Sequence, residues 1–522
     1  MTYAPPSHVT QNWQVTKPSA TGRRGIVVSQ AGDAAQAGLA ILEAGGNAID
    51  AAVGTALALA TVEPWNSGLG GIGFALVHRA GERRADVVDF GPVAPRGLDP
   101  SKFKLTGRMT QDLFSWPEVE GDANIHGPLS VVTPSAPAGY GEMHAKWGVL
   151  PFKDVIAPAI ALAKRGLAAD WFTTLKVANS ASVLRRYAES ARIYLPNDLP
   201  PVAPYQGTTR FFRQGNLPDT LAHLQHAGLR DIYEGDIAAS IAKDIAELGG
   251  VLSAEDLRAC RAIVRPAMEL PWGGRTLQLA GGLTAAPTLK RVMELIPDWP
   301  ETPDAAWFAA LARAMKAAYA ERLTTLGEAE PQAAESCTTH LTVCDAAGTM
   351  VAMTTTLLSS MGSRMVLPGS GILMNNGVMW FDPRPNRANS VAPGVRPLTN
   401  MCPAILAEDG RALAAAGSSG GRRILASVIQ LLSFFARFGM TPDQAAAHPR
   451  IDVSGPDGVT ADIRLSPETI AALREDGPVE IVEHAVLPVN FACPNMIVQH
   501  ADGTRTGISD VMSPWSTALA QA

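Results

Sequence analysis

The first part of the chain contains short apolar runs typical of strands and longer ones with the spacing of helices. The run GIVVS at residues 25–29 predicts a short buried strand. Residues 33–62 are rich in Ala and Leu at helical spacing, and Gly45-Gly46-Asn47 interrupts them once, which predicts two closely packed helices. Residues 73–78 and 86–90 then alternate between apolar and polar positions as the two strands of a hairpin do.

The middle of the chain is predominantly helical in its pattern. Amphipathic spacing predicts helices over residues 150–165, 237–248 and 305–322. An acidic stretch at 327–336 (GEAEPQAAES) then has the composition of an exposed loop. The helical region should therefore end in a loop near residue 336.

From residue 338 the pattern becomes that of a β-sheet. The runs TTHLTVC at 338–344 and MVAMTTTL at 350–357 predict two strands, and Asp345 to Gly348 supplies the turn between them. Further elements should follow: strands at 403–406 and 413–416, and a helix at 422–435. A sheet that begins directly after an exposed loop suits a chain that is cut at this junction.

Composition narrows the range of functions. The chain has 522 residues, of which 47% are hydrophobic and 18% charged, as in a well-packed globular protein. A net charge of -6 provides no basic surface for nucleic acid or for an anionic membrane. Five scattered cysteines without a CxxC pair predict neither a disulfide framework nor a zinc site. No secretory signal and no apolar run of about 20 residues is present, so we expect a cytoplasmic protein.

Several motifs occur in a characteristic order along nearly the whole chain. They are AGGNAIDAA at 44–52, EPWNSGLGGIGF at 63–74, Thr338-Thr339-His340, SGILMNN at 370–376, residues 396–398 and GSSGGRR at 417–423. In order and spacing this set resembles the γ-glutamyltranspeptidases, which are N-terminal-nucleophile hydrolases. The resemblance implies an α+β fold of the αββα type, in which two stacked antiparallel sheets lie between layers of helices.

The resemblance also implies a catalytic apparatus. Thr338 would be the nucleophile, Thr356 the hydroxyl that orients it, and Gly420 and Gly421 the backbone donors of an oxyanion hole. Cleavage of the bond between Cys337 and Thr338 would expose the α-amine that serves as base. The resulting large fragment 1–337 and small fragment 338–522 would form one heterodimer, with a dimer of heterodimers as an option. No metal or organic cofactor is implied.

The pattern departs from the family where a γ-glutamyl group would bind. The family's arginine after an Asp-Phe pair is replaced by Gly91, and its ammonium ligands are replaced by Leu358, Gly377 and Trp380. Candidate substrate-binding residues remain: Thr399, Asn400, Asn376 and Arg396, with Arg364, Arg422 and Arg423 as further cations for a carboxylate. The segment 376–383 is similar to oxamate amidohydrolases and cephalosporin-acylase-like members, so we expect a small amide of a dicarboxylic acid, hydrolysed through an acyl-enzyme.

Alternatives stay open at this point. Within the family, a γ-glutamyltransferase or glutathione hydrolase and a cephalosporin-type acylase are both consistent with the motifs. Gly417 to Gly421 also matches GxSxG, which would make Ser419 the nucleophile of a triad with His484 and either Asp443 or Asp452. An inactive binding module that keeps the fold is the remaining alternative. His340 should be a structural hydrogen-bonding residue, and Asp510 starts a closing motif that lacks its usual continuation.

Overall fold

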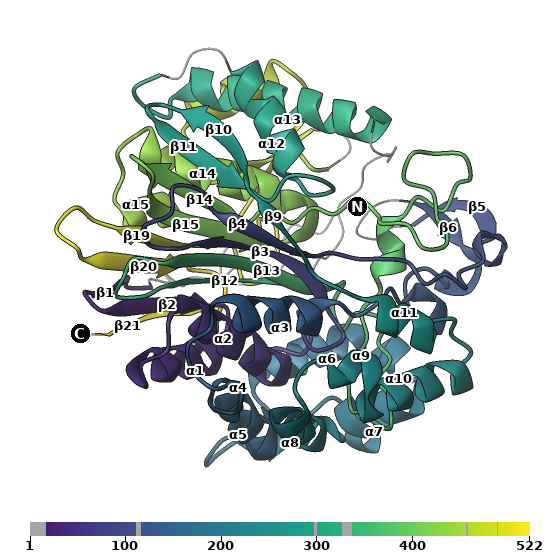
Figure 1. Ribbon diagram of the computed structural model, residues 1–522. Helices are drawn as coiled ribbons and strands as arrows, with labels where there is room; N and C mark the ends of the chain where they lie inside the picture. Colours follow the sequence, from purple (N-terminus) through teal and green to yellow (C-terminus); the bar gives the residue numbers. More distant parts are fainter. Residues whose placement is uncertain are drawn as a thin grey trace.

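Two stacked seven-stranded sheets form the centre of the molecule, and helices cover the outer face of each sheet (Figure 1). The computed structural model describes residues 17–110, 116–296, 300–325, 337–455, 458–487 and 489–521. The acidic segment 327–336, expected to be an exposed loop, lies outside these residues. Every strand pairing within the two large sheets is antiparallel.

The first sheet carries the strands that follow the predicted cleavage point. Its order is β21 (Thr517–Gln521), β2 (Gly25–Ser29), β12 (Cys337–Cys344), β13 (Met350–Leu358), β3 (Ile72–His78), β4 (Asp86–Phe90) and β9 (Ile263–Pro266). Helices α1 (Gly32–Glu43), α2 (Ala48–Val62) and α3 (Ala136–Trp147) cover its outer face. Alternate residues of one strand serve the two faces: Val27 packs against the helices, whereas Ile26 and Val28 face the second sheet.

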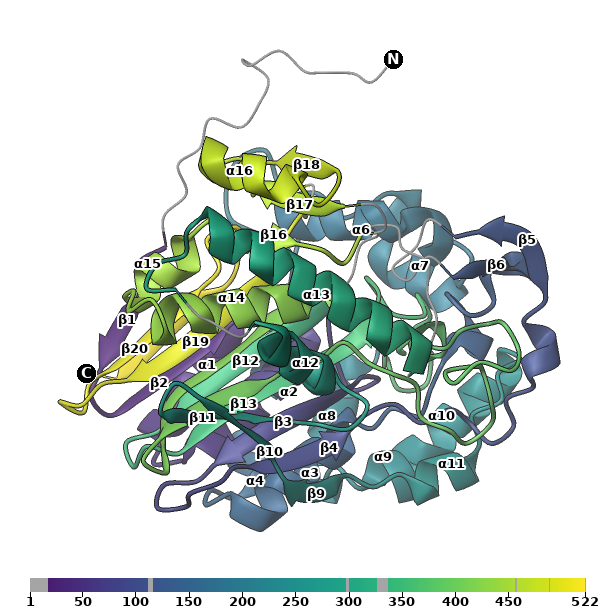
Figure 2. The ribbon, with the colours of Figure 1, turned by 90° about the horizontal axis from the view of Figure 1, so that it is seen from above.

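The second sheet lies under the other helical layer. Its order is β1 (Ala20–Gly22), β20 (Arg505–Ser509), β19 (Cys493–Gln499), β15 (Arg411–Ser419), β14 (Ala404–Glu408), β11 (Arg275–Leu279) and β10 (Met268–Trp272). Figure 2 looks onto the helices that cover it: α12 (Ala286–Leu295), α13 (Ala305–Thr325), α14 (Ile424–Ala436) and α15 (Pro442–Ala447). Buried apolar side chains fill the space between these helices and the sheet. The architecture is therefore the αββα sandwich predicted from the sequence.

The contact between α1 and α2 shows how small residues bring the helices together. A Cβ atom added at Gly38 would lie 2.2 Å from Oγ1 of Thr55, so only glycine allows this approach. Asn47 begins α2 by accepting hydrogen bonds from the N–H groups of Ile49 and Asp50 at 3.0 Å each. The predicted break at residues 45–47 is thus confirmed.

The remaining elements flank the sandwich. Helices of the middle region are α4 (Phe152–Val155), α5 (Ala157–Arg165), α6 (Trp171–Leu184), α7 (Ala188–Tyr194), α8 (Leu217–Ala227), α9 (Asp231–Glu234), α10 (Asp236–Glu247) and α11 (Ala254–Ala259). Two small ribbons pair β5 (Leu105–Met109) with β6 (Pro117–Val119) and β7 (Leu167–Ala168) with β8 (Phe211–Phe212). A last small sheet contains β16 (Ile451–Asp452), β17 (Val459–Asp462) and β18 (Val479–Val482), beside α16 (Pro467–Arg474).

Most predicted elements are found within a few residues of their expected bounds, and two differ in an informative way. The helix expected over 150–165 is divided into α4 and α5, because Pro158 lies at the start of α5 where its missing N–H costs nothing. The helix expected at 422–435 begins at Ile424, after a 3₁₀ turn at Gly421–Arg423. In the described parts of the chain, no helix combines the length and apolarity needed to cross a membrane.

Candidate active site

A bulge in the pairing of β12 with β13 lies beside Thr338. Cys337 lies opposite Leu358 and Thr339 lies opposite Thr355, so Thr338 alone faces two residues of β13, Thr356 and Leu357. The extra residue is therefore on β13, and a bulge of this kind bends the strand that carries it. Thr338 lies on the regular strand opposite the bulge, and only 5% of it is exposed to solvent.

The hydroxyl of Thr338 faces the hydroxyl of Thr356 on the neighbouring strand. Thr338 Oγ1 donates to Thr356 Oγ1 across 3.4 Å, and the Leu358 N–H donates to the same acceptor at 2.8 Å. Leu358 has a φ of 88°, which is rare for a residue with a branched side chain. The end of β13 thus adopts an unfavourable backbone conformation where it holds the Thr356 hydroxyl against Thr338.

Thr338 borders a small cavity of about 60 Å³. This volume is well below the roughly 300–1,000 Å³ of pockets that hold drug-sized ligands. Its lining comes from widely separated stretches of the chain, among them Gln30, Glu63 and Asn66, Lys176, Thr338, and Ser419 with Gly420. The space beside the Thr338 hydroxyl therefore suits a small group.

Two glycines stand at the end of β15 where the chain turns into α14. Gly420 has a φ of 143° and Gly421 a φ of 56°, both in the region that favours glycine. A Cβ atom at Gly420 would lie 2.5 Å from Cβ of Ala492, so no side chain fits there. Gly420 borders the cavity beside Thr338, and its role in an oxyanion hole stays a prediction.

Glu63 is a cavity residue to which the sequence assigned no role. It lies at the end of α2, is 4% exposed, and accepts a hydrogen bond from Nδ2 of Asn66 at 2.6 Å. Burial raises the pKa of the Glu63 carboxyl to about 7, and the nearby Lys176 ammonium opposes this rise. Glu63 and Asn66 belong to the motif at 63–74, to which the sequence analysis gave no chemical function.

The raised pKa of Glu63 predicts a pH-dependent stability. The folded protein holds this proton up to about pH 7, whereas the unfolded chain releases it near its ordinary value of 4.5. The free energy of unfolding should therefore fall as the pH rises from 4.5 to 7, and Glu63→Gln should remove this loss. We expect the variant to gain roughly 3 kcal/mol at pH 8 and nothing at pH 4. Urea denaturation at both pH values measures this gain, and an equal gain at both would refute the assignment.

The four predicted substrate-binding residues do not border the cavity. Thr399 Oγ1 donates to the Leu283 carbonyl at 2.9 Å, and Oδ1 of Asn400 lies 3.4 Å from a guanidinium nitrogen of Arg322. These two side chains hold the segment after residue 398 against the helical layer. Their binding role stays a prediction.

Asn376 and Arg396 also have partners within the protein. Nδ2 of Asn376 donates to the Ile125 carbonyl at 2.7 Å, and Arg396 forms an ion pair with Asp89. The Arg396 guanidinium lies 2.5 Å from the point where a Cβ of Gly91 would stand. It therefore occupies the space left by the side chain missing at residue 91.

The three other candidate arginines are likewise engaged. Arg364 donates to Oγ of Ser359 at 2.7 Å, and Arg423 donates to the Val489 carbonyl at 2.6 Å. Arg422 is buried with its guanidinium 6.0 Å from the centre of the Tyr319 ring. None of the three borders the Thr338 cavity.

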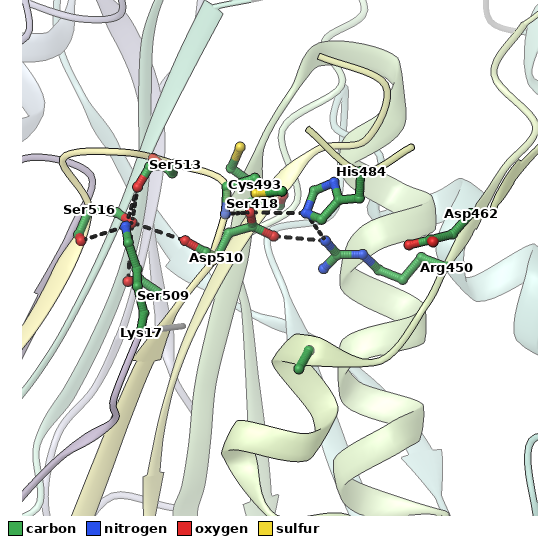
Figure 3. Close-up of polar contacts among 12 residues, drawn as sticks. Lys17, Ser418, Arg450, Asp462, His484, Cys493, Ser509, Asp510, Ser513 and Ser516 are labelled. Atoms are coloured by element: carbon green, nitrogen blue, oxygen red, sulfur yellow. Dashed lines mark hydrogen bonds and ion pairs between the residues drawn. The ribbon is translucent and has the colours of Figure 1, made fainter. Parts of the chain in front are cut away.

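A buried charged cluster surrounds Asp510 near the cavity wall (Figure 3). The Asp510 carboxylate accepts from Arg450 Nη2 at 2.7 Å and lies 3.2 Å from Nε2 of His484. Burial alone would raise the pKa of this carboxyl, but His484 and Arg450 hold it well below its usual range. Lys17 lies beside the same segment and donates to the carbonyls of Ser513 and Ser516.

The hydrogen bonds of this cluster are not those that the alternative triad on Ser419 requires. The Ser419 hydroxyl accepts a hydrogen bond from the Gln30 amide, while His484 pairs with Asp510. Asp443 accepts from the Ser19 N–H at 3.2 Å, and Asp452 accepts from Ser454. Neither aspartate is the partner of His484, and the fold is not that of an α/β-hydrolase, so the sequence-based triad on Ser419 is wrong.

His340 is a buried structural residue, as predicted. Its Nδ1 lies 2.8 Å from Oγ1 of Thr354, and burial lowers the pKa of the ring to about 3, so the ring is neutral. A Cβ at Gly417 would overlap this ring, being 2.1 Å from its Cε1. Within the described residues, no grouping of three or more His, Cys, Asp and Glu side chains is arranged to hold a metal ion.

Comparison with known proteins gives a consistent picture. A family model described as gamma-glutamyltranspeptidase matches residues 34–337 and 328–517. The chain is 28% identical to the glutathione hydrolase proenzyme of Escherichia coli (strain K12), covering 94% of this chain and 91% of the relative. It is 30% identical to the acylase ACY 1 proenzyme of Pseudomonas sp. (strain SE83), covering 94% and 92%.

The fold comparison agrees. The crystal structure of cephalosporin acylase from Bacillus halodurans matches with a TM-score of 0.84 at 22% identity, and the match covers 100% of both chains. The structure of Helicobacter pylori gamma-glutamyltranspeptidase matches with a TM-score of 0.50 at 26% identity over 57% of this chain and 82% of that one. This chain is therefore an enzyme of the gamma-glutamyltranspeptidase family, with the N-terminal-nucleophile hydrolase fold.

Proposed function

We propose that this protein cleaves itself between Cys337 and Thr338 and then hydrolyses a small amide of a dicarboxylic acid, such as oxamate, with Thr338 as nucleophile. One observation carries the proposal. Thr338 lies at the start of β12 opposite a bulge of β13, its hydroxyl faces Thr356, and both Thr338 and Gly420 border one small cavity.

The bond that self-cleavage would break lies inside β12, which runs through residues 337 and 338. In the uncut chain the Thr338 nitrogen is an amide and cannot act as a base. The Thr338 hydroxyl attacks the Cys337 carbonyl carbon, the C–N bond breaks, and the acyl group moves from nitrogen to oxygen. Water then hydrolyses the ester and leaves Thr338 with a free α-amine. Because strands from before and after this bond pair with each other in both sheets, the two fragments stay together.

The new amine completes the catalytic apparatus. It takes the proton of the Thr338 hydroxyl as the oxygen attacks the substrate carbonyl, and its reference pKa near 7.7–8.0 suits this at neutral pH. The backbone N–H groups at Gly420 and Gly421 stabilise the negative oxygen of the tetrahedral intermediate. The ammonium then protonates the leaving amine, and an acyl ester remains on Thr338. Water, activated by the same amine, releases the acid.

The cavity size and the altered ligands favour a small acyl group over a γ-glutamyl group. The position of the family's carboxylate-binding arginine is Gly91, and the cavity measures about 60 Å³. A second candidate, cephalosporin-type acylase activity, is favoured by the 30% identity to acylase ACY 1. Glutathione hydrolysis is the third option, suggested by the E. coli relative.

The test is to trap the acyl group on the enzyme. Purified protein is mixed with oxamate, a succinyl anilide, a γ-glutamyl anilide or an acylated cephalosporin, quenched in acid during turnover, and digested for mass analysis. We expect a succinyl or oxalyl adduct on the peptide that begins with Thr338, together with the fastest amine release from the same substrates. An adduct on the peptide containing Ser419 would overturn the proposal. An adduct on Thr338 from the cephalosporin alone would establish the second candidate.

A further inference from the structure

Among the described residues that line the Thr338 cavity, Lys176 is the cation. Lys176 of α6 borders the same cavity as Thr338, Ser419 and Gly420. It is half-buried, and its ammonium lies 5.1 Å from the centre of the Phe172 ring, which also borders the cavity. Among the described residues no carboxylate forms an ion pair with it, unlike Arg396, which Asp89 neutralises.

The other cavity groups leave this charge available to a ligand. Gln30 donates to Ser419, and Asn66 donates to Glu63, so both amides already have partners. Glu63 is the carboxyl group in the same cavity lining; burial raises its pKa to about 7, although the Lys176 charge opposes this rise, so Glu63 holds its proton more firmly than an exposed glutamate does. The Lys176 charge also lowers the pKa of Cys493, another cavity residue, against the rise caused by burial. Glu63 and Cys493, which both border the cavity, therefore lie close enough to feel the Lys176 charge.

A half-buried ammonium that lies over an aromatic ring and forms no ion pair within the described residues can bind an anionic group. We propose that Lys176 binds the free carboxylate of the acyl group and so selects monoamides of short dicarboxylic acids. In this arrangement the amide carbonyl lies at Thr338 and Gly420, and the carboxylate lies at α6. The inference rests on the proposed role of Thr338 and specifies the substrate class that this nucleophile accepts.

The experiment compares two substrates that differ mainly in charge. Succinyl-p-nitroanilide ends in a carboxylate, and butyryl-p-nitroanilide has a methyl group in its place. Wild-type enzyme should prefer the succinyl substrate in kcat/KM. In Lys176→Met the ratio of the two kcat/KM values should fall about 10- to 100-fold, because a hydrogen bond to a charged group is lost. Lys176→Arg should restore part of the preference.

A matched control is available on the surface. The Lys243 side chain is 72% exposed and pairs with Glu247 on α10, so Lys243→Met should leave the ratio unchanged. A charge reversal adds a positive result: Lys176→Glu should shift the preference toward 4-aminobutyryl-p-nitroanilide. If Lys176→Met keeps the wild-type ratio, the inference fails while the role of Thr338 stands.

Binding of the product succinate distinguishes a failure of the Lys176 site from a failure of the Thr338 assignment. Succinate should bind wild-type protein in calorimetry, and Lys176→Met should weaken this binding by a similar factor, whether or not the chain turns over substrate. If the acyl adduct is absent from Thr338 but succinate binding depends on Lys176, the nucleophile assignment fails and the carboxylate site stands. Equal succinate affinity in both proteins would overturn the site itself. Intact mass of each variant shows whether self-cleavage is preserved.

Discussion

The Thr338→Ala variant should remain a single chain of 54.9 kDa and should hydrolyse no amide. Removing the hydroxyl removes the atom that attacks the Cys337 carbonyl, so no α-amine is formed, and it also removes the atom that accepts the acyl group. Loss of a nucleophile of this kind costs about 10⁴-fold or more in kcat. Intact mass of freshly purified protein, followed by a p-nitroanilide assay, measures both effects.

Two control variants make this result specific. Thr338→Ser keeps a hydroxyl at this position and should still give two fragments whose small chain starts at residue 338. Ser419→Ala removes the other hydroxyl of the cavity, which accepts a hydrogen bond from Gln30, and should be cut like the wild type. A wild-type chain that hydrolyses amides without being cut would refute the N-terminal-threonine mechanism. A cut but inactive wild type would instead favour a binding module.

The fold could be predicted where a short stretch of sequence carries a strong helix-end, turn or strand signal. The helices α1 and α2 were predicted because Gly45, Gly46 and Asn47 carry strong end and cap signals. The hairpin of β12 and β13 was predicted because both strands are rich in β-branched residues and a turn motif joins them. Strands β9 and β10 were missed, since each is an edge strand and contains a proline, Pro266 and Pro271, which weakens a strand signal.

Some residues of the candidate active site could be predicted from the sequence, and one could not. The sequence motifs gave Thr338, Thr356 and Gly420, and the structure brings all three to one place; their chemical roles remain to be measured. Lys176 could not be found in the same way, because a half-buried lysine on a helix has no local signature. Its significance comes from the packing of α6 against residues that are distant in sequence, which only the folded chain reveals.

The cluster around Asp510 has an energetic consequence for the same cavity. Asp510 follows β20, and its carboxylate also accepts from the Met512 N–H at 2.8 Å. It thereby anchors the segment whose residues Met512, Ser513 and Pro514 form part of the cavity wall. The side chain of Arg450 is 3% exposed and that of Asp510 is fully buried, so both charges of this pair are removed from bulk solvent.

Asp510→Ala should therefore destabilise the protein by about 3–5 kcal/mol, because Arg450 is left buried without its anion. The surface pair of Arg23 and Asp502 supplies the control: the Asp502 side chain is 61% exposed, and Asp502→Ala should change the stability by less than about 1 kcal/mol. Urea denaturation of both variants measures the difference.

The depressed pKa of Asp510 predicts a pH dependence of this difference. The stabilisation that the Asp510 carboxylate contributes is complete above the ordinary aspartate pKa and is lost as the pH falls toward the lower folded value. The gap between wild type and Asp510→Ala should thus be widest near pH 7 and should narrow in strong acid. A loss no larger than that of Asp502→Ala would mean that Arg450 finds another partner, and that the wall beside Thr338 does not depend on this ion pair.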